Sequence, residues 1–236
     1  MQRYFCDKIE SNEYLLSKED SYHIIKVMRM NIGDKVEIVD KTVTYICEIS
    51  SLDPVKAKKV EKTSENNEND FEIIVVQSMV NETKMDLILQ KCTELGASGF
   101  YIYKAQNSVV KDNGKSEKKL DRWQKIVKEA AEQSKRNIIP KVHGIVDLKG
   151  LCMLVGDLKL LLSVNEKKKN IKNILKDKKK CDKIIIVIGP EGGFKDIEEE
   201  TLLENDFIAT SLGRRVLRTE TAGLATISMI NYEWMV

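Results

Sequence analysis

The sequence lacks the features that mark membrane, secreted and metal-binding proteins. Its longest apolar runs, "IIIVIG" and "LKLLLSV", are far too short to span a bilayer. The N-terminal "MQRYFCDKIE" contains no apolar core of a signal peptide. The five cysteines are scattered, without a CxxC spacing or a nearby histidine pair, which argues against a disulfide framework or a zinc site. We therefore expect a cytoplasmic protein with reduced cysteines, no metal and no membrane partner.

A strong net charge is also absent. Lys and Arg number 39 against 37 Asp and Glu, which gives a net charge of +2. Any affinity for nucleic acid must therefore come from local patches. Residues 104–141 carry eleven basic and five acidic side chains, and residues 149–183 carry eleven and four. Such patches supply phosphate affinity without sequence readout, but a solvated helix face explains most of these lysines equally well.

A polar stretch divides the chain. Residues 62–70, "KTSENNEND", contain no apolar side chain and predict a linker. Before it, "DKVEIVD" and "VKAKKVEK" alternate with a period of two, and with "VTYICEIS" they predict a small, mostly β module. After it, continuous apolar runs alternate with helical patterns, which predicts a parallel α/β sheet covered on both faces.

The second part of the chain predicts a regular series of elements. Helices are expected at 84–96, 117–137, 196–205 and 219–234, with a Lys-rich crossover helix around Ile171, Ile174 and Leu175. Strands are expected at 71–79, 99–103, 158–164, 182–189 and 207–213.

Two loops that follow expected strands contain residues suited to ligand binding. The first, "IGPEGGF" at 188–194, is rich in glycine, which lets backbone amides approach a ligand closely. Its spacing matches neither the dinucleotide-binding GxGxxG nor the GK[ST] of a phosphate-binding loop. As a glycine-rich turn alone it is weak support for a site, because many such loops only connect elements.

The second loop, "GRRVLRTETAG" at 213–223, leaves the expected strand "FIATSL". Arg214, Arg215 and Arg218 alone would best be explained as a solvated face. Thr219, however, is an N-cap candidate, and Glu220 suits the first turn of a helix. Both loops therefore leave the carboxyl ends of expected strands, which is where ligands bind in open α/β sheets.

Together these blocks resemble one family. "GPEGGF" followed by "SLGRRVLRTETA" is similar to the signature of the RsmE family, bacterial methyltransferases of the SPOUT superfamily. "KMDLILQKCTELGA" and "RWQKIVKEAAEQSKRNIIPKV" resemble further blocks of that family, as do "RYF" and "HIIKVMRMNIGDKVEIVD" near the N-terminus. The resemblance covers nearly the whole chain in order, and five matching blocks make it specific.

The resemblance implies both the fold and the function. It implies a PUA-like RNA-binding β-barrel domain at 1–68 and a SPOUT methyltransferase domain at 71–236 with a deep C-terminal trefoil knot. Knots are nearly absent from folds, so no periodicity in the sequence predicts this one. The implied reaction transfers a methyl group from S-adenosylmethionine to N3 of one uridine in small-subunit (16S) ribosomal RNA. The implied enzyme is a homodimer, and we expect it to act on the assembled small subunit.

The resemblance also suggests roles for individual residues. The cofactor would be bound by Ile188, Gly189, Pro190, Gly193, Ser211, Leu212, Gly213, Val216, Leu217 and Thr219. Catalysis would use Arg218 to stabilise negative charge on the uracil, and Glu220 or Glu191 as general base. RNA contacts are expected from Arg3, His23, Lys26, Arg29, Gln133, Ser134 and Arg136.

Simpler explanations and rival functions stay open at this point. Val216 and Leu217 are also suited to core packing, Glu220 to complementing a helix dipole, His23 to a structural role, and residues 133–136 to a helix end. A methyltransferase of the same fold acting on tRNA or on a ribose hydroxyl is the first rival. A non-catalytic RNA-binding or ribosome-assembly protein is the second. A Rossmann-type oxidoreductase is disfavoured by the missing fingerprint.

Overall fold

The computed structural model describes residues 1–108, 116–178 and 180–235, and these form two compact units. The first unit comprises residues 1–68 together with 131–139. The second comprises residues 69–130 together with 140–236. Residues 131–139 thus pack with the first unit, although the sequence had assigned everything from residue 71 onward to one domain.

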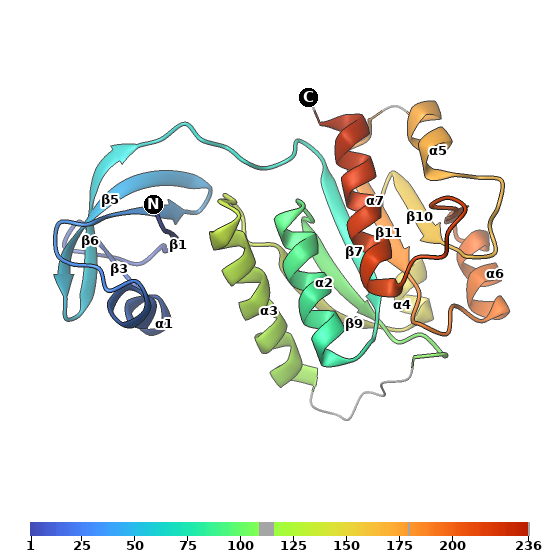
Figure 1. The fold of residues 1–236 in the computed structure, drawn as a ribbon, viewed down its shortest axis with the longest axis horizontal. Coiled ribbons are helices and arrows are strands. Elements are labelled where there is room, and N and C mark those ends of the chain that lie inside the picture. Colours follow the sequence, from blue (N-terminus) through green and yellow to red (C-terminus); the bar gives the residue numbers. More distant parts are fainter. Residues whose placement is uncertain (109–115, 179, 236) are drawn as a thin grey trace. The chain divides into compact units, whose positions relative to one another are not determined.

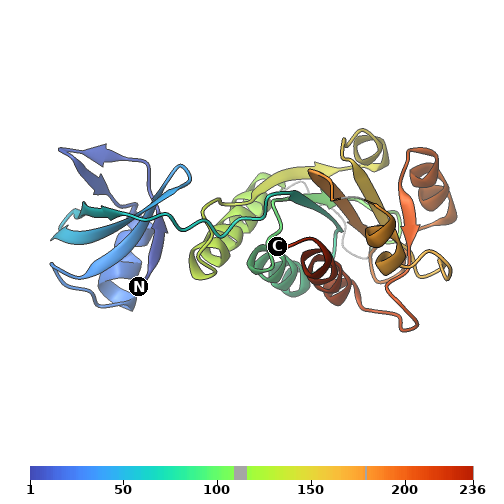
Figure 2. The ribbon, with the colours of Figure 1, turned by 90° about the horizontal axis from the view of Figure 1, so that it is seen from above.

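The first unit is built on a curled six-stranded sheet, drawn in blue and cyan in Figures 1 and 2. Strands β1 and β4 are parallel, and the other neighbours are antiparallel. The two alternating segments predicted from the sequence form β4 and β6, and "VTYICEIS" forms most of β5. A short helix, α1 (Lys18–Tyr22), runs directly into the π-helical turn His23–Val27. The strand order is β1 (Arg3–Phe5), β4 (Lys35–Asp40), β5 (Val43–Leu52), β6 (Val55–Lys62), β3 (Glu13–Leu15) and β2 (Ile9–Glu10).

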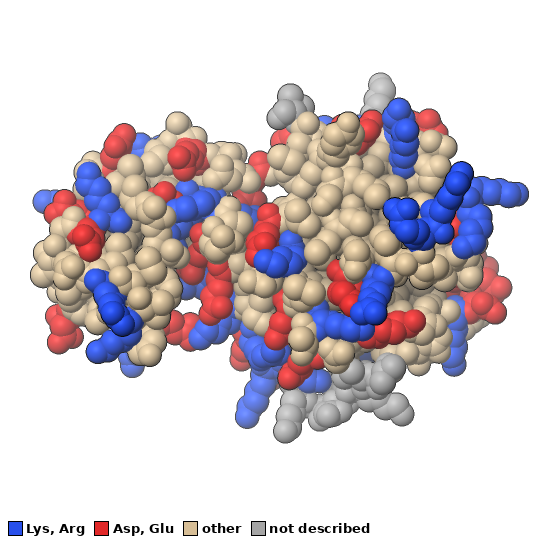
Figure 3. Space-filling view, viewed as in Figure 1, with Lys and Arg blue, Asp and Glu red and all other residues tan. Residues whose placement is uncertain are grey.

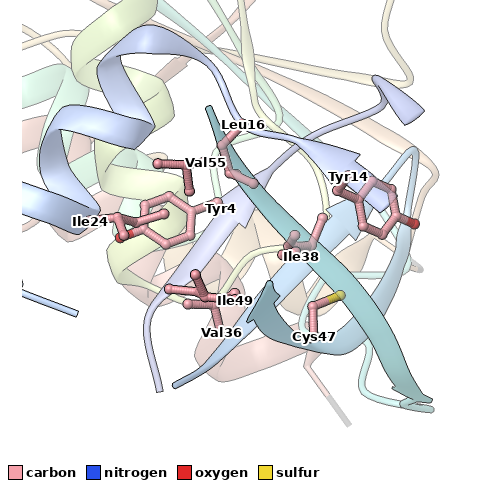
Figure 4. Close-up of a cluster of buried hydrophobic side chains, with 10 residues drawn as sticks. Tyr4, Tyr14, Leu16, Ile24, Val36, Ile38, Cys47, Ile49 and Val55 are labelled. Atoms are coloured by element: carbon pink, nitrogen blue, oxygen red, sulfur yellow. The ribbon is translucent and has the colours of Figure 1, made fainter. Parts of the chain in front are cut away.

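The core of this unit follows from the period-two pattern of its strands. Alternate residues such as Val36 and Ile38 point inward and are fully buried, as Figure 4 shows. Two buried tyrosines keep their hydroxyl groups paired. Tyr14 donates a hydrogen bond to Asp40 Oδ2 at 2.8 Å, and the Tyr4 hydroxyl lies 2.9 Å from His23 Nδ1. The remaining side chains of the cluster are Leu16, Ile24, Cys47, Ile49, Val55 and Ala57.

The segment 131–139 completes the first unit through a buried asparagine. Asn137 Nδ2 donates hydrogen bonds to Thr44 Oγ1 at 3.0 Å and to the backbone carbonyls of Thr42 and Glu65. Its Oδ1 accepts a hydrogen bond from the backbone N–H of Asn67 at 2.9 Å. Because all four partners belong to residues 42–67, this one side chain attaches the segment to the sheet and to the polar stretch that follows it.

Replacing this side chain tests how far the first unit depends on segment 131–139. Asn137→Ala removes the donors and the acceptor and leaves buried partners unpaired, so we expect a loss of stability of about 2 kcal/mol. Hydrogen exchange in β4–β6 and thermal unfolding followed by circular dichroism measure the effect. The exposed Asn173 in the second unit provides the control Asn173→Ala. Equal exchange in wild type and Asn137→Ala would contradict this role.

The second unit contains a six-stranded sheet in which all neighbours are parallel. The two central strands, β11 and β7, are apolar almost throughout and buried on both faces, as their continuous hydrophobic runs predicted. The sequence did not predict the edge strand β9, whose "KVHGIV" is only partly buried. The strand order is β12 (Ile208–Thr210), β10 (Leu158–Leu162), β11 (Lys183–Ile188), β7 (Glu72–Ser78), β8 (Gly99–Tyr103) and β9 (Lys141–Val146).

Helices cover both faces of this sheet (Figures 1 and 2). On one face α7 (Thr219–Trp234) packs against α2 (Glu82–Glu94), α5 (Ile171–Asp177) and strands β11 and β7. Helix α3 (Ser116–Gln133) lies beside α2 on that face and is joined to it by an ion pair between Arg122 and Asp86. On the other face α4 (Leu148–Cys152) and α6 (Asp196–Glu204) bury Leu151 and Leu202.

These helices confirm the predicted two-sided cover. Helix α7 has the predicted ends, 219–234, whereas the ends of α2, α3 and α6 differ from the predicted ones by up to four residues, and α4 was not predicted. Within the described part of the chain, no helix is both long enough and apolar enough for a membrane crossing.

Candidate active site

A cavity of about 620 Å³ lies at the carboxyl ends of β10, β11 and β12. Its walls are the segments that follow these strands, 162–167, 188–194 and 210–219. Lys84 of α2, Glu199 of α6 and Ala222 of α7 complete the lining. Because all strands of the sheet are parallel, these loops meet at one edge, as expected for the ligand site of an α/β sheet.

The cavity brings together the residues that the sequence proposed for the cofactor. All ten line it, and so do Glu191 and Arg218. Glu220 does not line the cavity, but it lies one residue beyond the lining residue Thr219. The ten are Ile188, Gly189, Pro190, Gly193, Ser211, Leu212, Gly213, Val216, Leu217 and Thr219. Val216 is exposed at 75%, so core packing does not explain it.

Sequence reasoning missed the third wall, the segment 162–167. It reads "LSVNEK": residues 162–164 were expected as the end of a strand, and Glu166 and Lys167 as the start of a Lys-rich connection without a role. In the structure it continues toward the loop after β12, where the backbone N–H of Ser211 donates to Lys169 O at 2.8 Å. The N–H of Ile171 in turn donates to Ser211 O at 3.0 Å. The only sequence signal was its position, directly after the carboxyl end of a buried strand.

Backbone conformation explains two of the glycines on the cavity wall. Gly193 has φ of +69° and Gly213 has φ of +119°, and the latter value is adopted almost only by glycine. The N–H of Gly193 donates to Pro190 O at 2.9 Å and closes a tight turn. Asn107 Nδ2 donates to Gly193 O at 3.2 Å and supports this turn from the segment after β8. A Cβ at either glycine would meet no other heavy atom within 4 Å.

Thr219 connects the two loops, in a role that the sequence did not predict. The N-cap position of α7 is occupied by Arg218, and Thr219 is the first helical residue. The Thr219 hydroxyl donates to Gly189 O at 2.7 Å and accepts from Gln77 Nε2 at 2.9 Å. Gln77 is fully buried at the end of β7. One hydroxyl therefore links the glycine loop, the start of α7 and the central strand.

Charged side chains gather beside the cavity at the first turn of α7. Lys84 Nζ lies 2.8 Å from Glu191 Oε1 and 3.6 Å from Glu220 Oε2. Arg218 is largely exposed, and its Nη1 lies 3.9 Å from Glu220 Oε1. In Figure 3 further blue side chains lie over the loop before α7, which contains the cavity-lining Arg214 and Arg215.

The ion pair with Lys84 changes the acidity of both partners. Partial burial raises the pKa of Glu191, but the hydrogen bond and positive charge of Lys84 outweigh it and hold this pKa below its ordinary value. The hydrogen bond and negative charge of Glu191 raise the pKa of Lys84. Both groups are therefore charged at neutral pH.

The residues proposed for RNA fall into two groups. The side chains of Arg3 and Arg136 are buried: Arg3 pairs with Glu37, and Arg136 pairs with Glu68. These two guanidinium groups hold the first unit together and offer no free cation to phosphate, which corrects the expectation of direct contact.

The other five proposed RNA residues are more accessible. Lys26, Arg29 and Gln133 are exposed, and Ser134 is half-buried. His23 is half-buried against Tyr4, the structural role that the sequence left open.

Comparison with known proteins identifies the family. Residues 67–231 match the family described as RNA methyltransferase domain, and residues 16–61 match the RNA methyltransferase PUA domain. The chain is 37% identical to ribosomal RNA small subunit methyltransferase E of Bacillus subtilis, over 99% of this chain and 97% of that protein. The chain belongs to the RsmE family. It is an RNA methyltransferase of the SPOUT fold with a PUA domain, as the sequence predicted.

Other members of the RsmE family agree over the same length. The enzyme of the same name from Mesomycoplasma hyopneumoniae is 30% identical over 95% of this chain and 96% of its own. A crystal structure of ribosomal RNA small subunit methyltransferase E from Neisseria gonorrhoeae, bound to S-adenosyl methionine, has a TM-score of 0.89. It is 29% identical and covers 99% of this chain and 98% of that chain. The trefoil knot expected for the family stays a prediction.

Removing the Thr219 hydroxyl tests the connection between the loops. Thr219→Val keeps the side-chain shape but removes the donor to Gly189 O and leaves the buried Gln77 Nε2 with only its hydrogen bond to Ser78 O, so we expect a loss of about 1–3 kcal/mol in the free energy of unfolding. Thr219→Ser keeps the hydroxyl and serves as the control. Both tryptophans, Trp123 and Trp234, lie in the second unit, so fluorescence-detected urea unfolding follows that unit. Equal unfolding midpoints for the Val and Ser variants would show that the hydroxyl contributes nothing.

Proposed function

We propose that this RsmE-family enzyme transfers the methyl group of S-adenosylmethionine to N3 of one uridine in small-subunit ribosomal RNA. We further propose that it acts in the cytoplasm on the assembled small subunit. The observation that carries the proposal is the cavity at the carboxyl ends of β10–β12, which collects all ten residues proposed for the cofactor. The full-length similarity to small-subunit methyltransferases supports the choice of RNA.

The cavity suits S-adenosylmethionine in size and in chemistry. Its volume of about 620 Å³ lies within the range of small-molecule sites, and it combines apolar side chains with loop backbone. Leu162, Ile188, Val216 and Leu217 offer apolar surface to an adenine ring, and the glycines leave backbone polar groups accessible. When bound, the cofactor supplies a methyl group already activated on a sulfonium.

The chain's own residues must then position the uracil and remove its N3 proton. Alignment alone supplies much of the rate in such transfers. Arg218 is largely exposed at the cavity wall, so its guanidinium is available to stabilise negative charge that develops on the uracil oxygens. A flipped-out or single-stranded uridine is required, because N3 is occupied in a base pair.

Of the two candidate bases we favour Glu220. Its side chain is 15% exposed, and its Oε2 is buried without a hydrogen-bond donor among the described residues. A buried oxygen without a partner is stabilised when it accepts a hydrogen bond from an N–H. A general base must accept such a hydrogen bond before it takes the proton. Glu191 is more exposed and already accepts a hydrogen bond from Lys84, which makes it the weaker base. The N3 proton would pass to the Glu220 carboxylate while N3 accepts the methyl group.

The remaining parts of the proposal concern assembly and RNA binding. We propose the deep knot and a homodimer, both on family resemblance. The backbone hydrogen bonds between residues 169–171 and Ser211 support the knot, because they join the loops after β10 and β12. For RNA we propose residues 1–68 as the binding domain, with the exposed Lys26 and Arg29 at the phosphates.

Gly213, at the start of the loop 213–223, tests the cofactor site. Gly213→Val forces a β-branched residue to φ of +119°, so the loop must distort, and we expect S-adenosylmethionine to bind at least about tenfold more weakly. Gly33→Val is the matched control, because Gly33 also has a positive φ with no heavy atom near its Cβ, but lies in the first unit. Calorimetric titration measures the affinity. Unchanged affinity in a folded Gly213→Val protein would refute the assignment of this loop.

Methyl transfer tests the whole proposal. Purified protein is incubated with labelled S-adenosylmethionine and small subunits that lack the modification, and the digested RNA is read by mass spectrometry. We expect N3-methyluridine at one site, and a fall in kcat of about a hundredfold or more in Glu220→Gln. In Glu191→Gln we expect a smaller fall in kcat. Transfer to tRNA or to a ribose hydroxyl instead would overturn the substrate, and the reverse order of the two Gln variants would make Glu191 the base.

A further inference from the structure

Lys84 is the one lysine on α2 whose side chain joins the cavity wall, and the sequence gave it no role. It lies in the first turn of the helix, where Asn81 caps its backbone N–H through a hydrogen bond of 3.0 Å. The acidic neighbours on α2, Glu82 and Asp86, form ion pairs with Arg122 of α3. Lys84 therefore directs its charge to the cavity rather than along its own helix.

The ammonium group of Lys84 contacts carboxylates from two different loops. Glu191 belongs to the glycine loop after β11, and Glu220 belongs to the first turn of α7. Because one Nζ lies within 2.8 Å of the first and 3.6 Å of the second, the two carboxylates are close neighbours. Two such groups without a cation between them tend to share a proton.

Other charged groups near this cluster are few. Arg218 reaches Glu220 Oε1 at 3.9 Å but is 84% exposed, so water screens much of its charge. Lys84 is only 26% exposed and is the better placed cation. The remaining charged side chains on the cavity wall are Glu166, Lys167, Glu199, Arg214 and Arg215.

We propose that Lys84 is a positioning residue for methyl transfer: its ammonium group lies between the carboxylates of Glu191 and Glu220 and holds both beside the cofactor cavity. The inference rests on the proposed function and adds a residue to it. Lys84 bonds Glu191 through the shorter contact, whereas the buried Glu220 Oε2 lies 3.6 Å from the same Nζ and has no hydrogen bond from the described residues.

The sign of the expected pH effect follows from this arrangement. A nearby cation lowers the pKa of a carboxylate, and a nearby carboxylate raises it. Without Lys84, one of the two acids would take up a proton at a higher pH than in the wild type. A base must be unprotonated to act, so activity on the acidic side would be lost at a higher pH.

Three variants separate charge from structure. Lys84→Met removes the cation and keeps the chain length, whereas Lys84→Arg keeps a cation. Lys91→Met is the matched control, because Lys91 lies on the same helix and pairs with Glu94 away from the cavity. For each variant, kcat and KM are measured across about pH 5 to 9 by labelled methyl transfer, and thermal unfolding confirms that the protein is folded.

We expect the acidic limb of kcat to move up by about one pH unit in Lys84→Met, with the KM for RNA changed by less than about threefold. In Lys84→Arg and in Lys91→Met, we expect kcat to fall at the same acidic pH as in the wild type. The proposal would be overturned if the pH at which kcat falls on the acidic side were unchanged in Lys84→Met, or if it shifted equally in Lys84→Arg.

A second measurement needs no RNA and therefore separates this inference from the proposed function. The carboxyl carbons of labelled glutamates are titrated by NMR, and Glu191 and Glu220 are assigned with their Gln variants. In Lys84→Met we expect the titration midpoint of at least one of them to rise by about one unit. Unchanged midpoints would refute the role of Lys84 even if the wild type methylates RNA. Raised midpoints in a protein that makes no N3-methyluridine would leave the charge arrangement standing and reject the proposed substrate.

Discussion

The hydroxyl of Thr219 is the contact on which the arrangement of the site depends. It joins the carbonyl of Gly189 to the buried amide of Gln77, and so fixes the glycine loop and the start of α7 to the central strand of the sheet. The sheet itself is rigid because its middle strands are buried on both faces. Loops alone are mobile, but loops hydrogen-bonded to such a strand keep a defined geometry. This geometry brings the backbone of two distant segments to one cavity.

Much of the fold could be predicted because the patterns are local. The period-two segments predicted β4 and β6, and strand β8 was predicted with its observed ends, 99–103. Strand β9 and helix α4 were missed because "KVHGIV" is partly polar and α4 is a single turn of five residues. Neither segment has enough apolar residues in a regular period to stand out from a loop. The packing of 131–139 with the first unit rests on polar contacts far apart in the sequence, which no periodicity records.

The candidate site was predicted unevenly, for a related reason. The glycine-rich loop 188–194 and the arginine-containing loop 213–223 could be recognised in the sequence, because clusters of glycine or of charged residues are unusual directly after apolar strands. Lys84 and the segment 162–167 were not visible, because a lysine on a helix and a short polar connection are common features of any surface. Only the three-dimensional structure shows that they join the cavity. Thr219 was noticed for the wrong reason, since its hydroxyl bonds Gly189 and Gln77 rather than capping the helix.

The first unit is discontinuous in the sequence, and this has a consequence for how the chain folds as it is made. Its sheet ends at Lys62, but Asn137 and Arg136 complete the hydrogen bonds and the ion pair that close it. Even Arg3, near the N-terminus, donates to the carbonyls of Lys135 and Arg136. During translation the first unit therefore cannot reach its final state until residue 139 has left the ribosome. By then only β7 and β8 of the second unit's sheet have been synthesised, so the first unit is completed while most of the second unit is still to be made.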